Sequence, residues 1–205
     1  HLASFGYRTG AITDSGFVSR VYGFDRGFEW FMELPERELS RTFELAQDFL
    51  DADDGRPTFL FVQSYRTHVP YRTGHAEDEE RYRDVLKRYG LNTELANGGE
   101  AVEGVPPEAA AELFELYRDC AQDLDHKLGG WVEELAAQSF FERGYFVLKS
   151  DHGEAFREHG DLGHGKTPWA EKMVTDSGGT WLRSRQRTAS ATRARTSSRL
   201  PSPLR

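Results

Sequence analysis

Acidic and imidazole side chains are concentrated in residues 150–171, around three His-Gly pairs. The apolar run Tyr145 to Leu148 leads into Asp151-His152-Gly153, and the last His-Gly pair begins at His164. A carboxylate beside a neutral imidazole can bind a divalent metal ion, and the glycines let the backbone turn tightly around it. Lys166 follows and supplies a positive charge for a sulfate or phosphate oxygen. The segment therefore predicts a metal and oxyanion site, whereas an isolated Asp-His-Gly is usually only a turn.

His68 is a second candidate, six residues beyond the apolar run that ends at Val62. An imidazole titrates near neutral pH, which suits a general acid. Pro70 restricts the backbone of the residue before it, and this stiffens the loop. The alternative is a loop histidine bonded to a neighbouring carbonyl. For His164 and Lys166 the alternative is two solvated loop residues, and His159 is interpreted as one of these.

Alternating helical and apolar segments must position these side chains. Residues 37–50 have apolar positions at helical spacing, and Thr58 to Val62 is a continuous apolar run, as in a buried parallel strand. Pro106-Pro107 open a long helix, and Tyr145 to Leu148 is expected to be the next strand. We predict an α/β domain with a mainly parallel sheet flanked by helices. The candidate residues then lie past the carboxyl ends of strands, where such sheets bind ligands.

Composition narrows the function classes. The chain has 205 residues and a net charge of −8, which argues against a nucleic-acid partner for the folded part. No apolar run reaches 18 residues, so no membrane span is expected. Residues 174–205 carry seven Arg and one acid, with almost no apolar periodicity. Residues 173–205 are expected to be disordered or read out of frame, or else to form a basic arm for an acidic partner.

Four further segments stand in the order and spacing of one enzyme family. They are Gly6-Tyr7-Arg8-Thr9, Tyr22 to Phe31, Phe59 to Val62 with Thr67-His68-Val69-Pro70-Tyr71, and Leu116 to Gly129. Together with residues 150–171 they resemble the sulfatases, in the alkaline phosphatase superfamily. The resemblance covers residues 1–172, which are expected to be part of an alkaline-phosphatase-like catalytic domain.

The resemblance implies metal-dependent hydrolysis of the sulfate ester of a small molecule or glycan. Asp151 and His152 would bind the metal, and calcium is the expected ion. Manganese and zinc are alternatives, because imidazole suits them better than calcium. His68 would contact the leaving oxygen or the sulfate, and Lys166 or His164 would contact a sulfate oxygen. A phosphodiesterase, phosphonate hydrolase or phosphotransferase of the superfamily is a second reading, and a non-catalytic fragment with a basic binding tail is a third.

The nucleophile of the family is missing from the sequence. Sulfatases carry a formylglycine made from Cys-x-Pro-x-Arg, but Cys120 is followed by Ala121-Gln122-Asp123-Leu124. Cys120 instead lies on the apolar stripe of the long predicted helix and is interpreted as a small core residue. We therefore expect the nucleophile to lie upstream of His1, and the 205-residue chain to be inactive alone.

Overall fold

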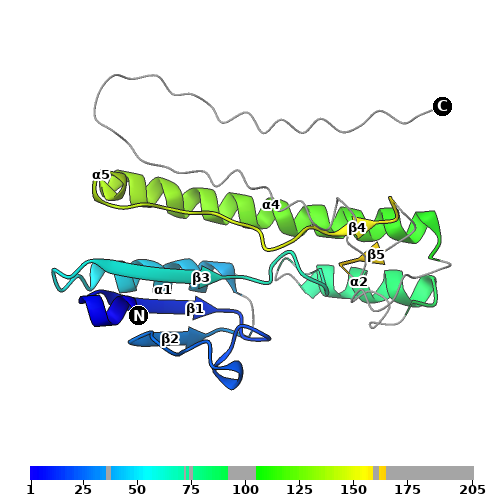
Figure 1. The fold of residues 1–205 in the computed structure, drawn as a ribbon. Helices are drawn as coiled ribbons and strands as arrows, with labels where there is room; N and C mark the ends of the chain where they lie inside the picture. The colour runs from blue at the N-terminus through cyan, green and yellow to red at the C-terminus, as the bar shows by residue number, and fades with distance from the viewer. Residues whose placement is uncertain (36–37, 72, 74–75, 92–104, 159–161, 165–205) are drawn as a thin grey trace.

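The computed structural model describes residues 1–35, 38–71, 73, 76–91, 105–158 and 162–164 (Figure 1). His159, Lys166 and the segment 173–205 lie outside the described residues. A parallel three-stranded sheet has the order β2-β1-β3. Its strands are β1 (Arg8–Thr13), β2 (Trp30–Glu33) and β3 (Thr58–Gln63). In the register of the sheet, Ala11 pairs with both Phe31 and Phe61.

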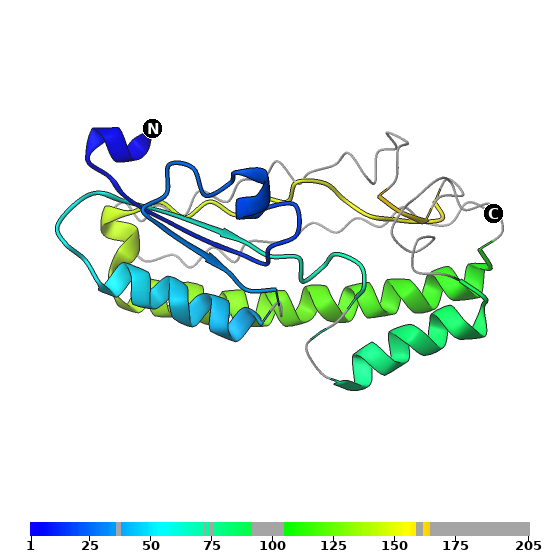
Figure 2. The same ribbon diagram turned by 90° about the horizontal axis from the view of Figure 1, so that it is seen from below.

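Two helices cover one face of this sheet (Figure 2). They are α1 (Leu39–Asp51) and the long α4 (Pro107–Ala137). Their apolar stripes bury Ile12 of β1 in one core cluster with Ala46, Trp131 and Leu135. The short helix α5 (Phe140–Arg143) follows α4 and packs against it.

A second core cluster forms at the amino-terminal half of α4. There α2 (Ala76–Arg88) packs along α4, and an antiparallel pair of short strands, β4 (Ala155–Phe156) and β5 (Leu162–Gly163), adds Leu162 to the same cluster. The remaining elements are the 3-10 turns η1 (Leu2–Phe5) and η2 (Arg20–Tyr22). The fold therefore has two adjoining cores on one long helix, and the segments that carry the candidate site lie beside the second.

The predicted class, an α/β domain with a mainly parallel sheet flanked by helices, is confirmed. Two predicted strands differ from expectation. β3 forms, but the side chains of its alternate residues Phe59 and Phe61 are 39% and 37% exposed, so it is not buried on both faces. Tyr145 to Leu148 is not a strand, because only Phe146 makes an isolated bridge there. An apolar run becomes a strand only where a neighbour offers a ladder of hydrogen bonds, and the sequence of the run does not encode that neighbour.

Among the described helices, none has both the length and the apolar composition that are needed to cross a membrane.

Gly10 in the middle of β1 lies directly under the ring of Phe49 from α1. A Cβ atom added at Gly10 would meet Phe49 ring carbons at 2.6 Å, whereas one added at Gly129 in α4 meets nothing within 4 Å. Gly10→Ala should therefore lower the free energy of unfolding by about 1–3 kcal/mol through overpacking. Gly129→Ala should raise it by up to about 1 kcal/mol, because alanine favours a helix interior.

Urea unfolding of the two variants checks this prediction. The unfolding free energies are compared with the same slope against urea concentration in both variants. A Gly10→Ala variant as stable as the wild-type chain would show that Phe49 can move aside at no cost.

Candidate functional site

Asp14 fixes the loop that carries His68. It follows β1 directly, and its buried carboxylate accepts hydrogen bonds from the Ser64 hydroxyl at 2.8 Å and the Tyr65 N–H at 2.6 Å. The parallel pairing of β1 with β3 brings the ends of both strands together, which is why an acid after one strand reaches the loop after the other. The His68 N–H then donates to the Tyr65 carbonyl at 2.9 Å. The backbone on both sides of the His68 ring is thus held in place.

The same loop is tied to the long helix α4. The buried side chain of Arg66 lies with its Nε 3.4 Å from Oδ2 of Asp123. The ring of His68 meets the ring of Tyr65 edge to face, with centroids 5.2 Å apart. The Val69–Pro70 peptide that follows is cis. His68 therefore has neighbours from its own loop on one side and faces the β4–β5 hairpin on the other.

Three imidazole rings form a row across this region. The centroid of His164 lies 4.7 Å from that of His68 and 4.5 Å from that of His152. His152 and His164 are stacked, with their planes at 30°, and His68 meets His164 edge-on. Residues separated by nearly a hundred positions in the sequence thus lie side by side.

All three rings place Nδ1 against an oxygen acceptor. The distances are 2.6 Å from His68 to the Val69 carbonyl, 2.9 Å from His152 to the Gly153 carbonyl, and 3.0 Å from His164 to a Glu154 oxygen. A carbonyl and an ionised carboxylate accept but cannot donate, so we assign the hydrogen to Nδ1 in each ring. In a neutral ring the lone pair then lies on Nε2, which is the atom that would bind a metal or accept a proton.

Glu154 is the buried acid of the site. Its side chain is only 5% exposed, and the hairpin register that pairs Ala155 with Gly163 puts Glu154 opposite His164. It also accepts a hydrogen bond from the buried Tyr71 hydroxyl. Burial first, and then the charge of Glu154, hold the pKa of Tyr71 well above its usual range. Tyr71 is therefore a neutral donor that helps to fix the carboxylate.

Asp151 lies at the exposed end of the row. Its side chain is 86% exposed, and Oδ2 lies 3.8 Å from His152 Nε2. Ligand atoms at about 2.0–2.3 Å from one ion are separated by about 3–4 Å, so this pair fits two neighbouring positions around a metal. Among the described residues, no group of three or more His, Cys, Asp or Glu is arranged to hold a metal ion. Two ligands alone do not complete the coordination of a divalent ion.

The structure brings four of the five predicted site residues into one region: His68, Asp151, His152 and His164. Lys166 is not described. The hydrogen bond from His68 Nδ1 to a neighbouring carbonyl, which is what an ordinary loop histidine would make, is present. Nε2 is therefore the ring atom that would take part in binding or proton transfer. Sequence reasoning gave no role to Asp14 or Tyr71. The signal for Asp14 was its place directly after the short stretch Ala11-Ile12-Thr13 at the end of β1.

The comparison with protein families agrees with the resemblance read from the sequence. Residues 2–189 match the family model described as Sulfatase, so this chain belongs to the sulfatase family. Its structure is similar to the crystal structure of the lipoteichoic acid synthase LtaP from Listeria monocytogenes, with a TM-score of 0.47 and 16% sequence identity. The similarity covers 74% of this chain but 35% of that one, so the chain spans about a third of LtaP. No curated protein sequence matches the chain.

Proposed function

We propose that this chain supplies the metal-binding and leaving-group side of a sulfuric ester hydrolase. The observation that carries the proposal is the row of three imidazoles, His152, His164 and His68, whose Nδ1 atoms are each held by an oxygen. Two acids adjoin the row: Asp151 is exposed beside His152 at one end, and Glu154 is buried behind His164 in the middle. Membership of the sulfatase family supports the same reading.

Each residue then has one task. Asp151 and His152 Nε2 would hold a divalent ion, which polarises the sulfate oxygens when bound. In its imidazolium form, His164 keeps its Nδ1–H on Glu154 and would donate its Nε2–H to a sulfate oxygen, a role that Lys166 could share. In its imidazolium form, which carries a hydrogen on both nitrogens, His68 would give the Nε2 proton to the departing alcohol oxygen and return to the neutral ring. Calcium is the expected ion, and manganese or zinc also suits a carboxylate with an imidazole.

Metal binding tests the proposal without requiring turnover. We expect titration of the chain with Mn²⁺, followed by electron paramagnetic resonance, to show one saturable site. Asp151→Ala and His152→Ala should each weaken it at least about tenfold, since each removes one ligand. Glu133→Ala removes an exposed charge from α4 and serves as the matched control. Equal Mn²⁺ affinity in Asp151→Ala and Glu133→Ala would remove the metal role from the proposal.

The reaction is tested separately. The sequence contains no Cys- or Ser-x-Pro-x-Arg nucleophile motif, so we predict no turnover of 4-nitrocatechol sulfate by the chain alone. Turnover above that of His68→Ala would contradict this prediction.

Phosphoryl transfer is the alternative that the site supports, because an imidazole rather than an amide follows Asp151 and suits manganese or zinc. Competition for the Mn²⁺-loaded chain separates the two readings. Sulfate should bind in preference to a phosphate diester if the substrate is a sulfate ester, and the reverse order would favour a phosphodiesterase or phosphotransferase.

A further inference from the structure

A cleft of about 380 Å³ lies at the amino ends of the strands, at the other end of the sheet from His68. Its walls come from the starts of β1 and β2, the carboxyl-terminal half of α1 and the turn before β3. Its lining includes Arg8, Trp30, Leu45, Asp48, Phe49 and Arg56. The volume is at the lower end of the range for small-molecule sites.

Arg8 is the buried cation of this cleft. It is 7% exposed, and its guanidinium carbon lies 4.3 Å above the Phe49 ring. Nη1 donates to the Ala52 carbonyl at 2.7 Å, while Nε and Nη2 lie 3.4 Å from Thr58 Oγ1, near the limit for a hydrogen bond. All these partners are neutral. Within the described residues, no carboxylate oxygen comes within 4.0 Å of the guanidinium nitrogens.

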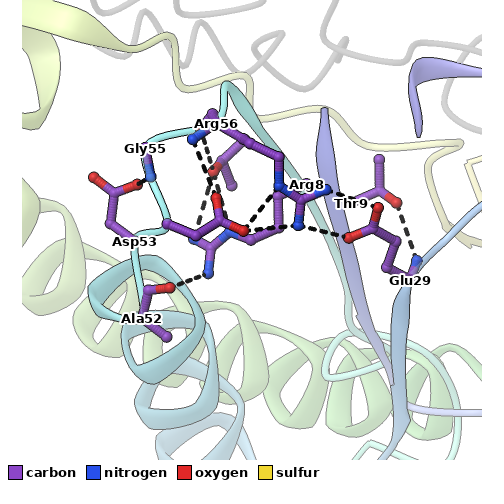
Figure 3. Close-up of polar contacts among 9 residues, drawn as sticks. Arg8, Thr9, Glu29, Ala52, Asp53, Gly55 and Arg56 are labelled. Atoms are coloured by element: carbon purple, nitrogen blue, oxygen red, sulfur yellow. Dashed lines mark hydrogen bonds and ion pairs between the residues drawn. The ribbon is translucent and has the colours of Figure 1, made fainter. Parts of the chain in front are cut away.

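The nearby acids are engaged with the second arginine instead (Figure 3). Glu29 holds Arg56 through two bonds of 2.9 and 3.0 Å, and Asp54 holds it at 2.7 and 2.8 Å. The hydrogen bond from Arg56 lowers the pKa of both carboxyl groups, so both are charged at neutral pH. Glu29 and Asp54 also attract Arg8 from beyond contact distance. Among the described residues no carboxylate contacts its guanidinium, so an incoming carboxylate can form the direct pair that these acids do not.

An apolar wall adjoins this charge. Trp30 and Phe49 are stacked, with centroids 5.1 Å apart and planes at 17°, and Leu45 lies beside them in the lining. Asp48, also in the lining, is exposed and repels a second negative charge. A single anionic group on an apolar body matches this combination, whereas a doubly charged ion such as sulfate does not.

We propose that this cleft binds a small monocarboxylate with an aromatic or branched apolar body, held by its carboxylate on Arg8 and by its body against Trp30, Leu45 and Phe49. An arginine and a carboxylate form a charge-assisted pair, and the stacked rings supply apolar contact area. The site is separate from the imidazole row and does not depend on sulfatase chemistry.

Calorimetric titration of the full chain with phenylacetate tests the proposal. We expect saturable binding with a Kd in the millimolar range or tighter, as suits a ligand of this size, and at least about tenfold weaker binding of the neutral isostere 2-phenylacetamide. Arg8→Gln should weaken phenylacetate about tenfold and leave 2-phenylacetamide unchanged.

A second pair of variants covers the case in which Arg8→Gln does not fold. Asp48→Asn, at an exposed position of the lining, should tighten phenylacetate binding about two- to threefold by removing a repulsive charge. Asp84→Asn, at an exposed position of α2, should not. No saturable binding, equal binding of the acid and the amide, or identical behaviour of the two Asp variants would overturn the proposal.

Discussion

The Glu154→Ala variant is expected to lose about 3 kcal/mol of unfolding free energy, which is roughly a 150-fold change in the folding equilibrium. The Glu154 carboxylate accepts bonds from the buried Tyr71 hydroxyl and from His164 Nδ1. Its removal takes that acceptor from two polar groups at once. Each buried group that loses its acceptor costs about 1–3 kcal/mol. Urea unfolding measures the change.

Glu154→Gln is the conservative control, because the amide keeps an acceptor oxygen of nearly the same shape. We expect it to retain most of the stability that Glu154→Ala loses. The imidazole NMR signals of His164 should shift in both variants, since the charge next to Nδ1 disappears in both. A Glu154→Ala variant as stable as the wild-type chain would mean that solvent reaches Tyr71 and replaces the carboxylate.

Cys120 is expected to react with a thiol reagent about a thousandfold more slowly in the folded chain than in urea at the same pH. The side chain is 1% exposed, and burial raises the pKa of its thiol to about 12. Only the thiolate reacts, so the shift by itself lowers the reactive fraction by about three powers of ten near neutral pH. Labelling with a chromogenic disulfide gives both rates. Equal rates would show that Cys120 does not lie in a closed core.

The same shift makes stability depend on pH. The folded pKa of Cys120 lies above the unfolded value, so its contribution is complete below about pH 8.5 and is lost as pH rises towards 12. The slope in that window is at most about 1.4 kcal/mol per pH unit. Cys120→Ala should decline less steeply there. Tyr71, whose pKa is also raised, adds a similar decline above about pH 10 in both chains.

Elements whose signal is local could be predicted from the sequence. The Pro106-Pro107 start and the apolar stripe through Cys120 and Trp131 anticipated α4, and the apolar run before Gln63 anticipated β3. Strand β2 gave no such signal, because Trp30–Glu33 lies in an aromatic, Gly-rich stretch. It forms because β1 offers it a parallel edge, which is a non-local contact.

The candidate site divides in the same way. Asp151, His152 and His68 could be predicted as site residues from the short sequence segments in which they lie. Their meeting through His164 depends on the β4–β5 hairpin, which turns the chain back so that His164 faces Glu154. Two-residue strands carry too little pattern to be predicted. Tyr71 reaches Glu154 only because both are buried beside α4, and no spacing in the sequence encodes that contact.

The three histidines differ in how far each depends on the rest of the molecule. His68 and His152 bond to the carbonyl of the very next residue, so a short stretch of chain selects their tautomer. His164 needs an acid ten positions away. During evolution the first two loops could be lengthened, grafted or recombined and still present the same ring nitrogen, whereas His164 must be inherited together with Glu154. Among homologous enzymes, these two positions are therefore expected to change as a pair.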